Sequence, residues 1–294
     1  QRCITTLKQL HMLVHATEEL RQTSLVGEGF CDYGKASQLV QAIRLLLTHF
    51  AAAQQARVLP LRQLATLVQM LQNGMHTSLK HGFRVVAFGA SKTKVLEETK
   101  TREAKSVRPK IEAAASEDED DDAEDEEEEI LMPERVLQGG IKFMEALGEP
   151  VWVQFRHEFC LDCLNDYSTL FEPPSNAPPK EEPSKRISSF KKKVTSDEAE
   201  NAEPPPGRLE NIEERFHWFR QEVLQKIIQD KFSDVFPVSW QIEATLARLF
   251  LKSTQSHLSA LLDPKGMCRD KEAANAPVLL KALQKTLVFE REIT

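Results

Sequence analysis

Cysteine is scarce in this chain of 294 residues, a net positive charge and a long apolar run are absent, and each shortage argues against a class of protein. The five cysteines are odd in number and irregularly spaced, which excludes a secreted disulfide scaffold and favours a reducing cytosol. No apolar run reaches the roughly eighteen residues that a membrane-spanning helix needs, so we expect a soluble chain. A net charge of -7 gives no basis for wrapping nucleic acid.

An initiator methionine and a helix-capping residue are also missing at the start, where residues 1–23 have the pattern of an amphipathic helix already under way. We therefore expect a fragment, with any signal peptide or earlier coiled coil outside it. The apolar positions repeat every three or four residues, as one face of a helix requires. The predicted partner or assembly face consists of Leu7, Leu10, Val14 and Leu20, which either pair with another chain or begin an intrachain bundle.

Acidic charge is concentrated in one run, Glu117 to Glu129, which holds twelve acidic residues in thirteen positions. A basic stretch, Lys92 to Lys110, precedes it, and a second polar stretch further on is rich in proline. Like charges repel and polar stretches bury little apolar surface, so both inserts are expected to be disordered. The predicted organisation is a helical segment 1–88, a charged insert 89–132, a helical segment 133–171, a proline-rich insert 172–207 and a helical bundle 208–294.

The remaining blocks all show helical periodicity, so the predicted fold class is all-α, with elongated helical bundles. Proline is tolerated in the first turn of a helix, and Pro60 predicts one that runs to about Val86. Pro133 predicts a short helix that ends at Gly148, and a longer one is expected from Val151 to Phe171. Further helices are expected from Leu209 to Val223, up to about Leu262, and from Pro277.

Aromatic and aliphatic side chains at helical spacing are typical of a core. The densest aromatic cluster is Phe216, Trp218, Phe219, Phe236 and Trp240, for which an exposed peptide-binding groove is the alternative. The last two residues lie in the sequence FPVSW. In that sequence Pro237 is expected to start a helix, with Phe236 and Trp240 on either side of the corner. The predicted structural core comprises Ile43, Leu47, Phe50, Phe216, Phe219, Phe236 and Trp240.

Three patterns resemble chemical sites, but each has a structural explanation that we favour. Cys160 and Cys163 form a CxxC without a second pair, so buried core thiols are favoured over a zinc site. His11, His15 and Glu18 share a helix face but lack the HExxH order of a zinc protease. The stretch Gly82 to Lys94 lacks the Gly-Lys pair of a phosphate loop. We therefore predict no catalytic residue, no cofactor and no metal, and hence no enzyme.

The inserts carry two possible phosphorylation sites. Ser116 directly precedes the acidic run, which suits an acid-directed kinase, and Ser188 follows the basic pair Lys185 and Arg186. A phosphate at either position would change how the inserts pair with nearby lysines. The alternative is that both inserts are solvated spacers.

Three passages together carry a resemblance to a known family. The first is ITTLKQLHMLV at Ile4 to Val14, followed by YGKASQLVQAIRLLLTHF at Tyr33 to Phe50. The second is FCLDCLNDYSTLF at Phe159 to Phe171. The third is LENIEERFHWFRQEV from Leu209, then FPVSW, then LLKALQKTLVFE from Leu279. Their order and spacing are similar to those of the family of vacuolar protein sorting-associated protein fifty-three, over nearly the whole chain outside the inserts.

The resemblance implies a non-catalytic subunit of the Golgi-associated retrograde protein complex and of the endosome-associated recycling protein complex. Its implied partners are sister subunits fifty-one, fifty-two and fifty-four, or fifty in the endosomal form, together with SNAREs and small GTPases. It also implies peripheral attachment to the cytosolic face of trans-Golgi and endosomal membranes, in retrograde transport and recycling. The two inserts look longer and more charged than the family's spacers, and most of the amino-terminal coiled coil and the carboxy-terminal bundles are missing.

An acidic-tract binding protein of the histone-chaperone type is the alternative function, which the composition permits. The acidic run separates two helical blocks here, however, whereas such tracts commonly form tails beside a compact domain.

Overall fold

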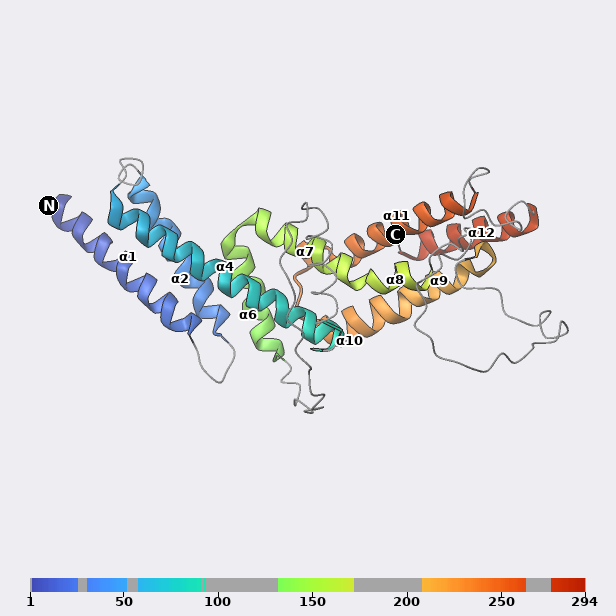
Figure 1. Cartoon of the computed structure of the whole chain (residues 1–294), viewed down its shortest axis with the longest axis horizontal. Helices are drawn as coiled ribbons and strands as arrows, with labels where there is room; N and C mark the ends of the chain where they lie inside the picture. The colour runs from blue at the N-terminus through green and yellow to red at the C-terminus, as the bar shows by residue number, and fades with distance from the viewer. Residues whose placement is uncertain are drawn as a thin grey trace, which may run out of the picture. The chain divides into compact units, whose positions relative to one another are not determined.

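Helices make up every regular element in the described part of the chain, which confirms the all-α prediction. The structure is a computed structural model that describes residues 2–25, 31–51, 58–90, 92–93, 132–171, 208–262 and 276–293. The elongated arrangement of the bundles stays a prediction. The elements are α1 (Arg2–Ser24), α2 (Tyr33–His49), α4 (Leu59–Phe88), α6 (Glu134–Leu147), α7 (Glu149–Cys163), α8 (Asn165–Leu170), η2 (Leu209–Asn211), α9 (Ile212–Trp218), η3 (Phe219–Gln229), α10 (Asp230–Phe232), η4 (Val238–Trp240), α11 (Ile242–Leu262) and α12 (Ala276–Ile293) (Figure 1).

The chain divides into two compact units. Unit 1 comprises Gln1–Arg156 and Lys231–Pro237, and unit 2 comprises His157–Asp230 and Val238–Thr294. Each unit therefore draws on more than one of the segments predicted from the sequence. Apart from residues 89, 90, 92, 93 and 132, the predicted inserts 89–132 and 172–207 lie outside the described residues.

Helix ends in unit 1 follow the proline and glycine signals closely. Helix α4 has Pro60 in its first turn, and its thirty residues give a length of about 45 Å at about 1.5 Å per residue. It ends at Gly89, whose φ of 82° is in the left-handed region that favours glycine. Helix α6 follows Pro133 and ends at Gly148, with a φ of 113°. Both helices therefore stop where a residue without Cβ can reverse the backbone.

Close helix approach builds the core of unit 1, where α2 packs against α1 and α6. On α6, Gly139 permits the approach to α2, and Gly140 permits the approach to α4. A Cβ added to Gly140 would lie 2.4 Å from Leu79 Cδ1, and one added to Gly139 would lie 3.1 Å from the backbone nitrogen of Gly34. The ring centroids of Tyr33 and Phe143 are 5.8 Å apart in the same α2–α6 contact. Glycine thus sets the interhelical distance.

Distant basic side chains cover two helix ends in unit 1. The Nη1 group of Arg44 donates to the backbone oxygen of Ala146 at 2.7 Å, next to the last residue of α6. The Nζ group of Lys231 donates to Val86 O at 3.0 Å and to Ala87 O at 2.8 Å in the last turn of α4. Helix carboxyl ends expose carbonyl groups with partial negative charge, so a cation there is stabilising.

Phe83 is the centre of an aromatic cluster in unit 1. Its ring centroid lies 5.1 Å from that of Phe155 and 5.7 Å from those of Phe232 and Phe236. The last two residues belong to the returning segment Lys231–Pro237. Aromatic pairs at such distances contribute beyond the area that they bury, so the cluster attaches this segment to α4.

Stacked aromatic rings build the core of unit 2. The rings of Phe216 and Phe289 stack with centroids 4.1 Å apart, and those of Phe219 and Phe250 with centroids 4.3 Å apart. Trp240 is also buried. The first stack connects α9 with α12, and the second connects η3 with α11. Two ion pairs, Arg220–Glu292 and Lys285–Glu213, add contacts between α12 and the α9–η3 region.

A fully buried arginine, Arg215, lies in the same unit, with its Cζ 5.8 Å from the ring centroid of Tyr167 and 5.3 Å from that of Phe171. Its Nη1 donates to Tyr167 Oη at 2.8 Å and lies 3.1 Å from His257 Nδ1, while its Nη2 donates to Phe171 O at 3.1 Å. Thr254 Oγ1 lies 2.7 Å from the same Tyr167 Oη. Hydrogen bonds to a buried charge offset the cost of removing it from water. This network joins α8, α9 and α11.

Two predicted helix boundaries in this half of the chain were wrong. The helix expected over Val151 to Phe171 is divided at Leu164, whose ψ of 4° departs from helical geometry before Asn165 starts α8. The helix expected to start at Pro237 begins instead at Ile242, after the short 3-10 turn η4. Gln241 has a φ of 48°, which interrupts the helix just before that point.

The segment Phe219–Gln229 is wound as a π-helix, which the sequence pattern did not predict. The backbone N–H of Asp230 accordingly bonds to the carbonyl of Gln225, five residues earlier. The winding still places Phe219, Val223 and Ile228 in the core.

Candidate assembly surface on the first helix

Helix α1 has two distinct faces, of which one is buried in unit 1. Leu13, Thr17 and Leu20 are almost completely covered, and α1 packs against α2 and α4. Thr17 Oγ1 donates to Leu13 O at 2.8 Å, which satisfies its buried hydroxyl within the helix. This inner face stabilises unit 1 and is not available to another chain.

The second face, called here the outer face, is exposed although it carries large apolar side chains. The exposed fractions are 60% for Ile4, 64% for Leu7 and 51% for Val14. The face follows the alternating spacing of three and four residues that a coiled coil uses. Its positions are Ile4, Leu7, His11, Val14, Glu18, Arg21 and Leu25. Exposed apolar side chains at this spacing make the outer face a candidate contact site for another chain.

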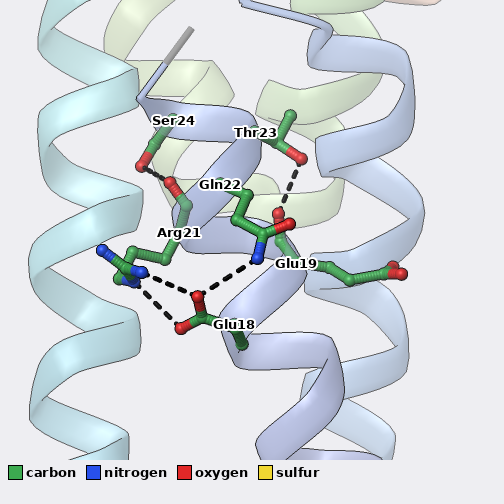
Figure 2. Close-up of polar contacts among 6 residues, drawn as sticks. All are labelled: Glu18, Glu19, Arg21, Gln22, Thr23 and Ser24. Carbon is green, nitrogen blue, oxygen red and sulfur yellow. Dashed lines mark hydrogen bonds and ion pairs between the residues drawn. The ribbon is translucent and has the colours of Figure 1, made fainter.

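A cluster of polar contacts occupies the carboxyl-terminal part of the outer face. Figure 2 shows Glu18 accepting hydrogen bonds from Arg21 Nε at 2.9 Å, Arg21 Nη2 at 2.7 Å and Gln22 Nε2 at 3.2 Å. These bonds, above all those from Arg21, lower the pKa of Glu18 from 4.5 to about 2. In the same figure Ser24 Oγ donates to the Arg21 carbonyl and Thr23 Oγ1 donates to the Glu19 carbonyl.

The structure separates the four predicted assembly residues. Leu7 and Val14 lie on the outer face, Leu10 is half-buried, and Leu20 lies on the inner face. The sequence pattern missed Ile4 as a member of the exposed set. The signal was present, because Ile4 precedes Leu7 by three residues and His11 by seven.

The predicted core residues fall in both units. Ile43 and Phe50 are buried and Leu47 is partly covered in unit 1, where Phe236 also contacts Phe83. Phe216, Phe219 and Trp240 are buried in unit 2.

The cysteines and histidines that resembled chemical sites differ in burial. Cys160 and Cys163 are buried in α7, and burial raises the pKa of the Cys163 thiol well above its ordinary value of 9.0. A protonated thiol is a poor metal ligand and nucleophile. His11 and His15 are exposed on α1, with ring centroids 6.5 Å apart. Within the described ranges, no group of three or more histidine, cysteine and acidic side chains is arranged to hold a metal ion.

Ser116 and Ser188, together with the acidic run on which the histone-chaperone alternative depends, lie outside the described residues.

Unit 2 has a shallow groove of about 540 Å³ along α9 and η3. Its lining combines carboxylates with the indole ring of Trp218, which belongs to the aromatic cluster for which the sequence left a groove as the alternative. The lining residues are Glu210, Asn211, Glu213, Glu214, His217, Trp218, Gln221 and Glu222. Lys285 bonds to Glu213 at 2.8 Å, so one of these carboxylates is already used in the contact with α12.

These features define an all-α protein whose candidate site is an exposed helix face with apolar side chains. Residues 198–294, the last third of the chain, match the family model described as Vps53, N-terminal. The family resemblance predicted from the sequence is thereby confirmed over that region. Vps53-family proteins are subunits of multisubunit tethering complexes, peripheral to membranes and generally not enzymes.

No curated protein and no solved structure gives a significant match to the chain. Among the described helices, none combines the length and the apolar character needed to cross a bilayer.

Proposed function

We propose that this chain is a non-catalytic subunit of a vesicle-tethering complex and binds sister subunits through the outer face of α1. The observation that carries the proposal is the exposed apolar surface of Ile4, Leu7 and Val14 in a chain that matches the Vps53 family. Covering one such side chain contributes about 1.5 to 3 kcal/mol. The face is therefore strong enough to contribute to stable assembly.

The proposed transport steps are retrograde transport from endosomes to the trans-Golgi network and endosomal recycling. The sister subunits would be fifty-one, fifty-two and fifty-four, or fifty in the endosomal form, with SNAREs and small GTPases as further partners. The complex would hold the chain peripherally on the cytosolic face of these membranes. The family match and the resemblance of the three sequence passages support this assignment.

The experiment is co-purification of tagged sister subunits with the chain carrying Leu7→Asp and Val14→Asp. Both side chains point away from the core, so the variant should fold but lose most of its partners. A matched control replaces Leu45 and Met70 with Asp, because these residues are 67% and 60% exposed on α2 and α4 of the same unit. Wild-type recovery of all partners by the α1 variant would exclude the outer face as the assembly site.

Phosphorylation of Ser116 and Ser188 is a further part of the proposal. Added charge would change how the inserts pair with nearby lysines, and so would adjust assembly. Phosphopeptide mapping of the protein purified from cells tests this directly. Complete absence of phosphate at both serines would remove the regulatory role.

A further inference from the structure

The outer face of α1 is interrupted by the charged pair Glu18 and Arg21. With the alternating spacing of three and four residues, one set of positions is Ile4, His11, Glu18 and Leu25, and the other is Leu7, Val14 and Arg21. The amino-terminal half is therefore mainly apolar, whereas Glu18 and Arg21 occupy successive contact positions further along. Figure 2 shows both side chains on the same side of α1.

Both charged side chains remain accessible to an approaching helix. About half of each side chain is exposed, 45% for Arg21 and 48% for Glu18. Two hydrogen bonds, at 2.9 Å and 2.7 Å, join the carboxylate and the guanidinium. A partner helix that covers Leu7 and Val14 and continues along α1 must meet these two groups.

Charged residues at contact positions of a helix pair cost free energy unless the partner matches them. In a parallel, in-register pair of two copies of this chain, Glu18 would face Glu18 and Arg21 would face Arg21. Such like-charge contacts disfavour that pairing. A helix with a basic residue opposite Glu18 and an acidic residue opposite Arg21 is instead favoured.

We infer that Glu18 and Arg21 select the partner of α1. That partner is a helix of a different chain, with an apolar stripe opposite Ile4 to Val14 and opposite charges at the two following contact positions. The inference rests on the proposed function, because it takes the outer face as the assembly surface. It adds the residues that decide which helix binds and in which register.

The test uses the full chain and two labelled helical peptides, with binding followed by fluorescence anisotropy. The peptides share all apolar contact residues and differ only at two positions. The matched peptide has Lys opposite Glu18 and Glu opposite Arg21, and the other peptide has these charges exchanged. We expect the matched peptide to bind about tenfold more tightly, and this preference to decrease at high salt.

The charge-exchanged variant of the chain, Glu18→Lys with Arg21→Glu, should reverse this preference. Its control is Glu243→Lys with Lys252→Glu on α11, which makes the same changes at exposed positions of unit 2 and should preserve the wild-type preference. Circular dichroism of each variant verifies that the helical content is retained.

Equal binding of both peptides by wild type and variant would overturn the selection by Glu18 and Arg21. If Leu7→Asp with Val14→Asp still released the sister subunits, the proposed function would stand. A second outcome is that neither peptide binds and the wild-type chain self-associates in sedimentation velocity, whereas the Leu7→Asp and Val14→Asp variant does not. This outcome would identify a second copy as the occupant and overturn the inference. Failure of both peptides without self-association would also overturn it.

Discussion

Units 1 and 2 are both helical, but they solve the problem of packing helices in different ways. Unit 1 brings α6 close to its neighbours through glycines, with Gly140 against Leu79 and Gly139 against Gly34. Unit 2 packs its helices through stacked phenylalanine rings and a hydrogen-bonded buried arginine, Arg215. We therefore expect added side-chain volume to destabilise unit 1. Lost volume or lost hydrogen-bond partners should destabilise unit 2.

The largest expected effect comes from removing volume in unit 2. Trp240→Ala should lower the free energy of unfolding by about 3 to 5 kcal/mol, because the buried ring leaves a cavity. Hydrogen exchange should locate the loss in α11. Trp152→Ala, at a half-buried position of α7, is the control and should cost less. An unchanged unfolding curve for Trp240→Ala would contradict the role of this ring in the core.

Removing the buried cation should have the next largest effect. Arg215→Met keeps much of the side-chain volume but leaves Phe171 O without its donor and removes one bond to Tyr167 Oη. We expect a loss of about 2 to 4 kcal/mol, measured by denaturant unfolding. Arg248→Met, at an exposed position of α11, should change stability by about 0.5 kcal/mol or less. Equal effects of the two substitutions would show that the network contributes no net stability.

Added volume tests unit 1. Gly140→Ala forces the new methyl group against Leu79, and we expect a loss of about 1 to 3 kcal/mol with reduced hydrogen-exchange protection in α4 and α6. Gly74→Ala is the matched control, since a Cβ there meets no atom within 4 Å. This control should stabilise α4 by about 0.5 to 1 kcal/mol. Tolerance of alanine at both positions would mean that glycine does not set the α4–α6 distance.

The smallest expected effect concerns the surface pair on α1. The pKa of Glu18 in the folded state, about 2, lies below the ordinary value of 4.5. The contribution of Glu18 to stability is therefore present above about pH 4.5 and is lost as the pH falls toward 2. Arg21→Gln should return this pKa toward 4.5 in an NMR titration. The exposure of the pair predicts little change in global stability at neutral pH. A Glu18 pKa that stayed near 2 in this variant would exclude Arg21 as its main cause.

Proline and glycine predicted helix ends well because they act through local geometry. Pro60, Pro133 and Gly148 lie within a residue or two of the observed ends of α4 and α6. Local geometry also explains the failure at Pro237, since the left-handed φ of Gln241 moved the start of α11 to Ile242. No sequence rule favours that conformation at glutamine.

Periodicity predicted that α1 is amphipathic, but it could not divide the two faces. Both the Leu7–Val14 set and the Leu13–Leu20 set repeat at helical spacing, and only packing against α2 and α4 decides which set is covered.

The sequence analysis did not predict Arg215 as a buried residue, because its burial also depends on tertiary packing. It lies three residues after Ile212 and four before Phe219, on the apolar side of the helix, yet its charge and acidic neighbours are typical of a surface. Its hydrogen-bond partners come from α8 and α11, far away in the sequence.

The returning segment Lys231–Pro237 has a consequence for synthesis on the ribosome. Residues 157–230 separate it from the rest of unit 1, and their translation takes about 4 to 15 s at about 5 to 20 residues per second. During that interval Phe83 lacks two of its aromatic neighbours, and the last carbonyls of α4 lack the Lys231 ammonium. Unit 1 therefore cannot complete its packing until Lys231–Pro237 has been translated, after residues 157–230 of unit 2. The order in which the units complete folding thus differs from the order of translation.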